Sequence, residues 1–205
     1  MNAVAERSPV RKGRPRDARI DRDITAAALA VLSEDGFERF SVEQVACRAG
    51  VAKTSVYRRF PSRTDLIVGA LERLNDDLPP APPPGPVRER LVHVLTGVRE
   101  RVATSERGRL LMQVVAGEGS RDPRLVRLVH ERVLAPRRQL LRDLVLDGIA
   151  GGELRPDIDV EAVIPLLVGP MVYLGMWGAH APQRDVTVEA VLDTVLSGLT
   201  RATCS

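Results

Sequence analysis

The sequence has few of the residues that build metal and redox sites. Its 205 residues include two cysteines and three histidines, and 3% of them are aromatic. The histidines His93, His130 and His180 are scattered without ligand-like spacing, so we expect no metal site and no cofactor. Cys47 and Cys204 cannot form a disulfide framework, and no apolar run resembles a secretory signal. These absences predict a cytoplasmic protein with reduced thiols.

Patterns that carry catalysis are also missing. The sequence offers no paired carboxylates in a helix interior, no nucleophile motif and no metal-ligand spacing. We therefore expect no catalytic residues and no enzymatic activity.

The longest uncharged stretch is "AVIPLLVGPMVYLGMWGA", residues 162–179, which reaches the lower limit for a membrane-spanning helix. Two prolines and three glycines in it favour a helix buried within protein instead. We expect no membrane segment.

Neither sign of charge dominates, since the net charge is +3 with 44% hydrophobic and 28% charged residues. This balance is typical of a globular protein of one large or two small domains. The proline-rich "LPPAPPPGP", residues 78–86, is the clearest boundary. It predicts two domains, residues 1–78 and residues 79–205.

Apolar residues recur at helical intervals throughout, and no strand-like alternation is present, so the fold class is predicted to be all-α. In the N-terminal part a helix over 17–35 ends at Gly36, and shorter helices cover 41–48, 53–60 and 62–75. The C-terminal part has helices that begin near 87, 110 and 122, the apolar segment, and a last helix from about 188. Pro136 predicts a kink in the helix of 122–150.

The second and third helices have the pattern of a helix-turn-helix. Ser41 and Gln44 form a capping-box start, and Gly50 permits a tight turn before the next helix. Val56 and Phe60 define the buried edge of that helix. A short helix presented in this way fits a DNA major groove.

The opposite face of the third helix carries donors suited to DNA. Arg58 can donate two hydrogen bonds to a guanine, while Thr54 and Ser55 can contact base edges, with Arg59 beside them. Phosphate contacts are expected from positions at the flank and at helix starts, namely Lys53, Tyr57, Ser41 and Arg63. The alternative from spacing alone is a structural helical hairpin with a solvated basic face.

Residues 7–19, "RSPVRKGRPRDAR", hold six basic side chains and one acidic side chain among glycine and proline. The segment is typical of a flexible cationic arm, in which Arg14 and Arg16 are candidate DNA contacts. A solubilising tail is the other interpretation.

The segment "ITAAALAVLSEDGFERFSVEQVACRAGVAKTSVYRRFPSRTDLI", residues 24–67, closely resembles TetR-type transcriptional regulators, and "GELRPDIDVEAVIPLLVGPMVYLGMW", residues 152–177, resembles them more weakly. The resemblance implies an all-helical homodimer with an N-terminal three-helix DNA-binding domain. It also implies a C-terminal domain for dimerisation and ligand binding. The recognition-helix contacts of the family carry over to Lys53, Ser55, Tyr57 and Arg58, and Arg63 matches the usual lysine at the start of helix four.

Three positions depart from the family pattern. Ala52 replaces the usual capping residue and removes about 1 kcal/mol of helix capping. Thr54 replaces a frequent glycine, and Arg59 replaces a common histidine. Thr54 adds a side chain at the groove and is expected to alter which bases are read, and Arg59 adds a charge.

The sequence of the C-terminal part does not identify a ligand. Met112, Met171, Tyr173 and Trp177 are candidates to line a cavity, but methionines and aromatics at helical spacing are also ordinary core residues. Gly169 permits close helix contact at the dimer interface that the resemblance implies.

The predicted function is a sequence-specific DNA-binding regulator, a repressor released from a palindromic double-stranded DNA operator by a small apolar effector. The alternative is a helical small-molecule carrier or sensor without specific DNA binding.

Overall fold

The computed structural model describes residues 15–73, 82–116, 122–177 and 186–199, and in these ranges every regular element is helical. This confirms the predicted all-α class. The elements in chain order are α1 (Pro15–Arg39), α2 (Val42–Arg48), α3 (Lys53–Tyr57), α4 (Arg63–Glu72), α5 (Val87–Thr104), α6 (Glu106–Ala116), α7 (Pro123–Val129), a π-helical segment (His130–Leu134), α8 (Ala135–Ala150), α9 (Val160–Trp177) and α10 (Val188–Ser197).

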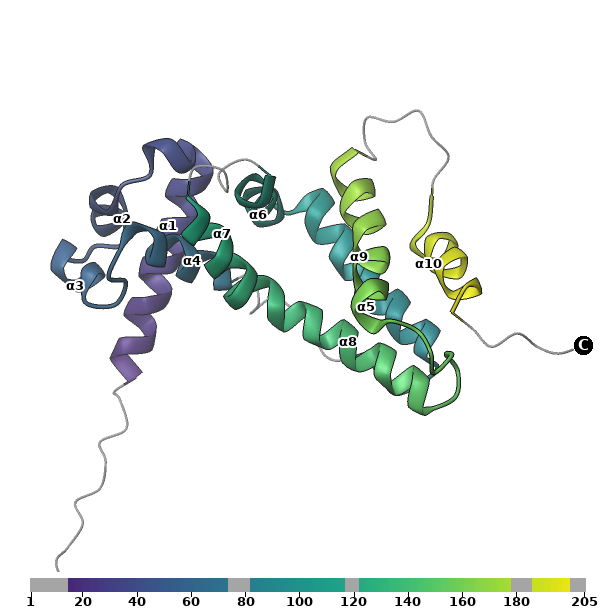
Figure 1. Ribbon diagram of the computed structural model, residues 1–205. Helices are drawn as coiled ribbons and strands as arrows, with labels where there is room; N and C mark the ends of the chain where they lie inside the picture. The colour runs from purple at the N-terminus through teal and green to yellow at the C-terminus, as the bar shows by residue number, and fades with distance from the viewer. Residues whose placement is uncertain (1–14, 74–81, 117–121, 178–185, 200–205) are drawn as a thin grey trace, which may run out of the picture.

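The helices form two parts joined by one long helix (Figure 1). Helices α1 to α4 gather at one end of the molecule, and α5, α9 and α10 gather at the other. The continuous run of α7, the π-helical segment and α8 extends from the first part to the far end of the second. This run therefore links the two parts, as does the junction of α5 and α6.

Two hydrophobic cores match this division, but they do not follow the chain order. The first core combines residues of α1 to α4 with Leu110, Leu111 and Val114 of α6, and with Leu125, Val129 and Val133 of α7 and the π-helical segment. The second core is built by α5, α8, α9 and α10. The predicted boundary at 78 and 79 lies outside the described residues, and part of the C-terminal sequence packs with the N-terminal helices.

Helix α4 is tied to the following helices by polar contacts along its length. Arg124 binds Asp65 at 3.2 Å. The Thr64 hydroxyl donates to Asp122 at 3.0 Å. Arg132 donates two hydrogen bonds to Glu72, of 2.6 and 2.8 Å.

The predicted kink at Pro136 takes the form of a π-helical turn directly before this proline. Proline has no amide hydrogen and clashes with the carbonyl four residues earlier, so a regular helix cannot pass through it undisturbed. The Ala135 amide instead reaches the carbonyl of His130, five residues back. The wider turn keeps α7 and α8 joined while it changes the direction of the side chains between them.

Two further boundaries differ from the sequence prediction. Gly36 has the expected positive φ of 74°, but the helical assignment continues past it to Arg39. Helix α3 ends at Tyr57, three residues before the predicted end, and Arg58 is its C-cap residue. The Arg58 amide still reaches the Thr54 carbonyl at 3.1 Å, so its side chain keeps a helical direction.

Candidate nucleic-acid interface and effector cavity

The helix-turn-helix begins at the predicted capping box. The Ser41 hydroxyl accepts from the Gln44 amide at 3.2 Å, and the Gln44 side chain accepts from the Ser41 amide at 3.1 Å. Gln44 also donates to Asp35 of α1 at 2.7 Å, which fixes the start of α2 against α1. At the next start, α4, the Ser62 hydroxyl accepts from the Asp65 amide, but Asp65 accepts from the hydroxyl rather than reaching back to the backbone.

The turn between α2 and α3 depends on Gly50. Its φ of 65° is in the left-handed region, where a side chain is strained. The following amide, of Val51, donates to the Ala46 carbonyl at 3.0 Å and closes the end of α2. Val51 packs against the first core.

Helix α3 is anchored by one face and open on the other. Val56 is completely buried, and Phe60 packs against the same core. Lys53 and Tyr57 are exposed, and so are Thr54 and Arg58, while Ser55 is partly exposed. No side chain caps the start of α3 at Ala52, in agreement with the expected departure. The arrangement gives a short rigid helix with an outward polar face.

Lys53 is held by two neighbours. Its ammonium group donates to Glu43 of α2 and lies 5.7 Å from the centre of the Tyr57 ring. The hydrogen bond to Lys53 lowers the pKa of Glu43, and the same bond raises the pKa of Lys53. Both groups are therefore charged at neutral pH, and an acid stands beside the predicted DNA-facing surface.

The position of Arg59 differs from the predicted one. Its side chain is 12% exposed and its guanidinium binds Asp21 of α1, so it does not stand beside the outward face of α3. It also donates to the Ser55 carbonyl at 3.3 Å. These contacts tie α3 to α1 and give Arg59 a positioning role.

Arg63 turns back towards the end of α1. Its guanidinium donates to the carbonyls of Phe37 and, at 3.2 Å, of Phe40, and it lies 5.6 Å from the Phe40 ring centre. Of the two remaining predicted contacts, Arg14 lies outside the described residues. Arg16 belongs to α1, but its side chain is not described.

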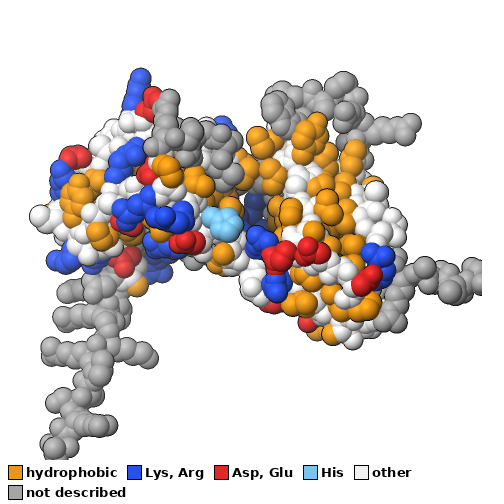
Figure 2. All heavy atoms as spheres, in the orientation of Figure 1, with side chains coloured by type: hydrophobic (Ala, Val, Ile, Leu, Met, Phe, Trp, Pro, Cys, Tyr) orange, Lys and Arg blue, Asp and Glu red, His pale blue; other side chains and the backbone are white. Residues whose placement is uncertain are grey.

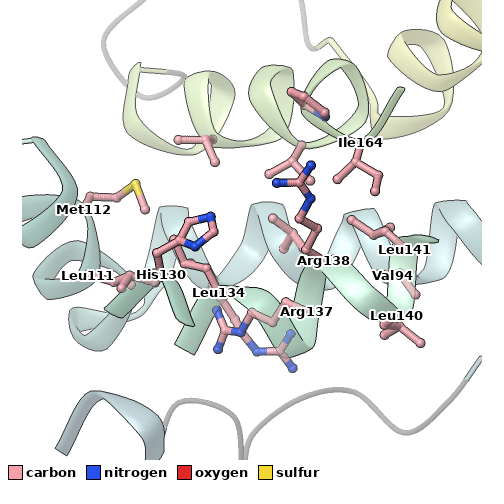
Figure 3. A pocket seen from close by; sticks show the side chains of 16 residues that line it. Val94, Leu111, Met112, His130, Leu134, Arg137, Arg138, Leu140, Leu141 and Ile164 are labelled. Atoms are coloured by element: carbon pink, nitrogen blue, oxygen red, sulfur yellow. The ribbon is translucent and has the colours of Figure 1, made fainter. Parts of the chain in front are cut away.

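The C-terminal part contains a cavity of about 280 Å³ between α5, α6, the π-helical segment, α8 and α9. Figure 3 shows Leu111, Met112 and His130 at one end and Leu140 and Ile164 towards the other. The lining is mostly apolar and consists of Val94, Val98, Arg101, Gly108, Leu111, Met112, His130, Leu134, Arg137, Arg138, Leu140, Leu141, Ile164, Pro165, Val168 and Val172.

The cavity selects one of the four predicted ligand-lining residues. Met112 lines it, whereas Met171 is completely buried in the second core and Tyr173 is 57% exposed. The side chain of Trp177 is not described. The lining residues Arg101, His130, Arg137 and Arg138 were not predicted from the sequence, because only methionines and aromatic residues were considered as candidates to line an apolar cavity.

Helix α9 has an outward apolar face. Leu166, Tyr173 and Met176 are 56%, 57% and 42% exposed, and their spacing places them on one side of the helix. Gly169 lies on the same side, where an added Cβ meets nothing within 4 Å. Figure 2 shows hydrophobic side chains gathered on the C-terminal part where α9 lies in Figure 1. Such a contiguous apolar face is typical of a contact with another protein surface.

In the ranges that the structure describes, no group of three histidine, cysteine or acidic side chains is arranged to hold a metal ion. Across those same residues, no helix is both long and apolar enough to cross a bilayer.

The short exposed helix on a tight glycine turn, with an attached helical bundle, defines a helix-turn-helix DNA-binding protein. Comparison with known families agrees. Residues 24–70 match the bacterial regulatory proteins of the tetR family, and residues 81–195 match the tetracyclin repressor-like C-terminal domain. The chain belongs to the TetR family and is a helix-turn-helix transcriptional regulator.

Individual relatives cover most of the chain. It is 32% identical over 163 residues to YdeS, an HTH-type transcriptional regulator of Bacillus subtilis (strain 168). The aligned region covers 80% of this chain and 81% of YdeS. It is 25% identical over 187 residues to the HTH-type regulator Rv1556 of Mycobacterium tuberculosis, covering 89% of each. The crystal structure of the TetR family transcription regulator SCO0332 is similar with a TM-score of 0.70 and 26% identity, over 91% of this chain and 100% of that one.

Proposed function

We propose that this regulator is a repressor that binds a roughly palindromic operator as a homodimer and is released when a small, largely apolar molecule enters the cavity. The observation that carries the proposal is the outward polar face of α3, held in place by the buried Val56. A helix of this size with an arginine and small hydroxyl groups on its open face matches the shape and chemistry of the major groove. As such a regulator, it acts in the cytoplasm, where the DNA is.

The contacts on DNA divide by chemistry. Arg58 reads a guanine, and Thr54 and Ser55 contact neighbouring base edges. Phosphates are contacted by Lys53, Tyr57, Ser41 and Arg63, and by Arg14 and Arg16 of the N-terminal arm. Arg63 has five N–H donors, so its bonds to the two phenylalanine carbonyls leave capacity for a phosphate.

Arg59 supports the interface indirectly. Its ion pair with Asp21 and its bond to Ser55 hold α3 at a fixed angle to α1. A direct contact of Arg59 with DNA requires that its guanidinium leave Asp21.

The two predicted domains have different functions. Residues 1–78 bind DNA, and residues 79–205 bind the effector and the second subunit. The outward apolar face of α9 supports the dimer, because Leu166, Tyr173 and Met176 gain most by becoming buried against a second copy. The two recognition helices then contact half-sites about one DNA turn apart, or a multiple of it.

The test is operator binding by Arg58 variants, measured by fluorescence anisotropy on the DNA upstream of the protein's own gene. Arg58→Ala is expected to lose roughly 1 to 3 kcal/mol of specific binding and to relax the preference at one base pair. Arg58→Lys keeps the charge but loses the two-pronged donor, so it should keep the salt dependence and still lose the base preference.

Two results would count against the proposal. Unchanged affinity and base preference in Arg58→Ala would show that this face of α3 does not read bases. A wild-type protein that binds the cavity ligand but shows no saturable preference for any upstream DNA would be a carrier instead.

A further inference from the structure

The cavity carries a cluster of positive charge. Among the lining residues that the structure describes are three arginines, Arg101, Arg137 and Arg138, together with His130, and none of these described residues is an aspartate or glutamate. The whole chain has a net charge of only +3, with 30 basic and 27 acidic side chains. Three arginines in the lining of one mostly apolar cavity are therefore a local concentration that the composition does not account for.

The arginines approach the cavity from different directions. Arg137 and Arg138 follow Pro136 on α8, and Figure 3 shows Arg138 reaching towards α9 while Arg137 leaves α8 on the other side in this view. Arg101 comes from α5 and also donates to the Gly97 carbonyl at 3.2 Å. The side chains of Arg101, Arg137 and Arg138 are all partly buried, where a charge interacts more strongly with an anion than it does in water.

One of these arginines already binds a carboxylate within the protein. Arg138 binds Glu161 at the start of α9, and Glu161 also binds Arg142. Glu161 does not line the cavity, but its carboxylate meets a guanidinium that does. A ligand carboxylate near Arg138 would make the same kind of charge-assisted hydrogen bond.

The volume limits the apolar part of the ligand. At about 30 Å³ for each water-sized group, the cavity of about 280 Å³ corresponds to roughly nine non-hydrogen groups. The aliphatic lining, with residues such as Val94, Leu141 and Ile164, suits a flexible alkyl chain of that length.

From the lining, the charge and the volume, we infer that the effector is an anionic amphiphile, with a medium-length alkyl chain in the cavity and an acidic headgroup bound by one or more of the lining arginines Arg101, Arg137 and Arg138. The inference rests on the proposed function and names the ligand class for its cavity. Two sources share this chemistry: a free medium-chain carboxylic acid and its thioester with a phosphate-bearing carrier.

The test compares ligands that differ only in the charge of the headgroup. Octanoate, octanol and octylamine have the same alkyl chain, and binding of each to the full-length protein is measured by isothermal titration calorimetry at pH 7. Octanoate is expected to bind about tenfold or more tightly than octanol, and octylamine most weakly, because a charge-assisted hydrogen bond to arginine adds to the burial of the chain. Octanoyl-coenzyme A is a fourth ligand that distinguishes the thioester from the free acid.

Substitutions of the lining arginines test which of them binds the headgroup. Arg101→Gln, Arg137→Gln and Arg138→Gln are tested one at a time, and at least one should lose about tenfold in affinity for the preferred anion while octanol binding stays unchanged. Arg88→Gln is the control, because Arg88 lies on α5 like Arg101 but pairs with Asp193 and does not line the cavity, so this variant should bind every ligand like the wild type.

Equal affinities for octanoate, octanoyl-coenzyme A and octanol would overturn the inference, because the arginines would then contribute only their aliphatic stems. So would tightest binding of octylamine, or undiminished anion binding in all three variants. Operator binding is measured separately, so a protein that reads its operator through Arg58 but binds neither anion retains the proposed DNA-binding function and loses only the ligand class. Anion binding without any release of operator would leave the ligand class standing and contradict the proposed release.

Discussion

Arg132 and Glu72 join the π-helical segment to the end of α4 through two hydrogen bonds of 2.6 and 2.8 Å. His130 and Leu134, two residues on either side of Arg132, line the cavity. Val133, between them, is completely buried in the core shared with α1 to α4. A single turn of helix therefore contacts both the cavity and the core of the DNA-binding part. Together with Leu111 of α6, which also lines the cavity and belongs to that core, it forms a route by which the two can influence each other.

Because of this contact, operator binding should change the amide hydrogen exchange of the π-helical segment. In the wild type, operator DNA should slow amide hydrogen exchange in residues 130–134, because DNA that fixes α4 also fixes its partner. In Glu72→Gln the protection of this segment should decrease, while protection of α3 stays. Mass spectrometry with and without operator measures both.

The control for this prediction is Arg88→Gln. Arg88 donates to Asp193 with bonds of 2.7 and 2.9 Å, so a similar two-bonded ion pair is lost at a place remote from α4. It should leave the effect of operator on residues 130–134 intact. If Glu72→Gln behaves like this control, the ion pair does not carry the coupling.

Substitution of Glu43 should increase the affinity for DNA rather than decrease it. Its carboxylate neutralises Lys53 beside the outward face of α3 and would repel phosphates. The pKa of Glu43 is lowered from its ordinary value of 4.5, so the group is ionised throughout the neutral range. Glu43→Gln should therefore strengthen binding slightly, and on all DNA sequences alike.

The measurement is affinity for operator and for unrelated DNA across a salt series. Glu34→Gln is the matched control, since Glu34 binds Arg48 in a comparable exposed ion pair outside α3. A gain in the control equal to that of Glu43→Gln would mean that only the overall charge matters. A loss of affinity in Glu43→Gln would mean that Glu43 positions Lys53 for DNA.

Local sequence signals predicted the helix-turn-helix well. The capping box of Ser41 and Gln44 and the glycine turn at Gly50 involve residues close in the chain, so their chemistry is readable from spacing. The partner of Arg59 was not readable in this way, because Asp21 is 38 residues away and the contact depends on how α1 packs on α3.

The cavity was harder to predict for a related reason. Residues of α5, α6, the π-helical segment, α8 and α9 build it, and α9 is apolar on every side, so its pattern does not separate core from surface. Met171 faces the core while Tyr173, two residues later, faces outward. Residues on one apolar helix therefore had to be assigned by packing, which the sequence does not contain.

The contact of Arg59 with Asp21 predicts an effect on stability rather than on base preference. Arg59→Gln and Asp21→Asn should each destabilise the fold by about 1 kcal/mol, because the pair is partly buried. The double variant should lose less than the sum of the two, since either change already breaks the bond. Urea denaturation measures all four proteins, and additive losses would show that the two side chains do not interact in solution.

The outward face of α9 predicts the oligomeric state. Leu166 is 56% exposed there, and Leu166→Glu places a charge at the centre of the proposed subunit contact, which should convert a dimer to a monomer at micromolar concentration. Leu146→Glu on α8 is the matched control, because Leu146 is also exposed, at 41%, but belongs to another helix. Sedimentation equilibrium distinguishes the outcomes. A monomeric wild type, or a dimer that survives Leu166→Glu, would exclude α9 as the interface. A monomer produced by Leu166→Glu should also lose operator affinity, because its two half-sites are then no longer bound as one unit.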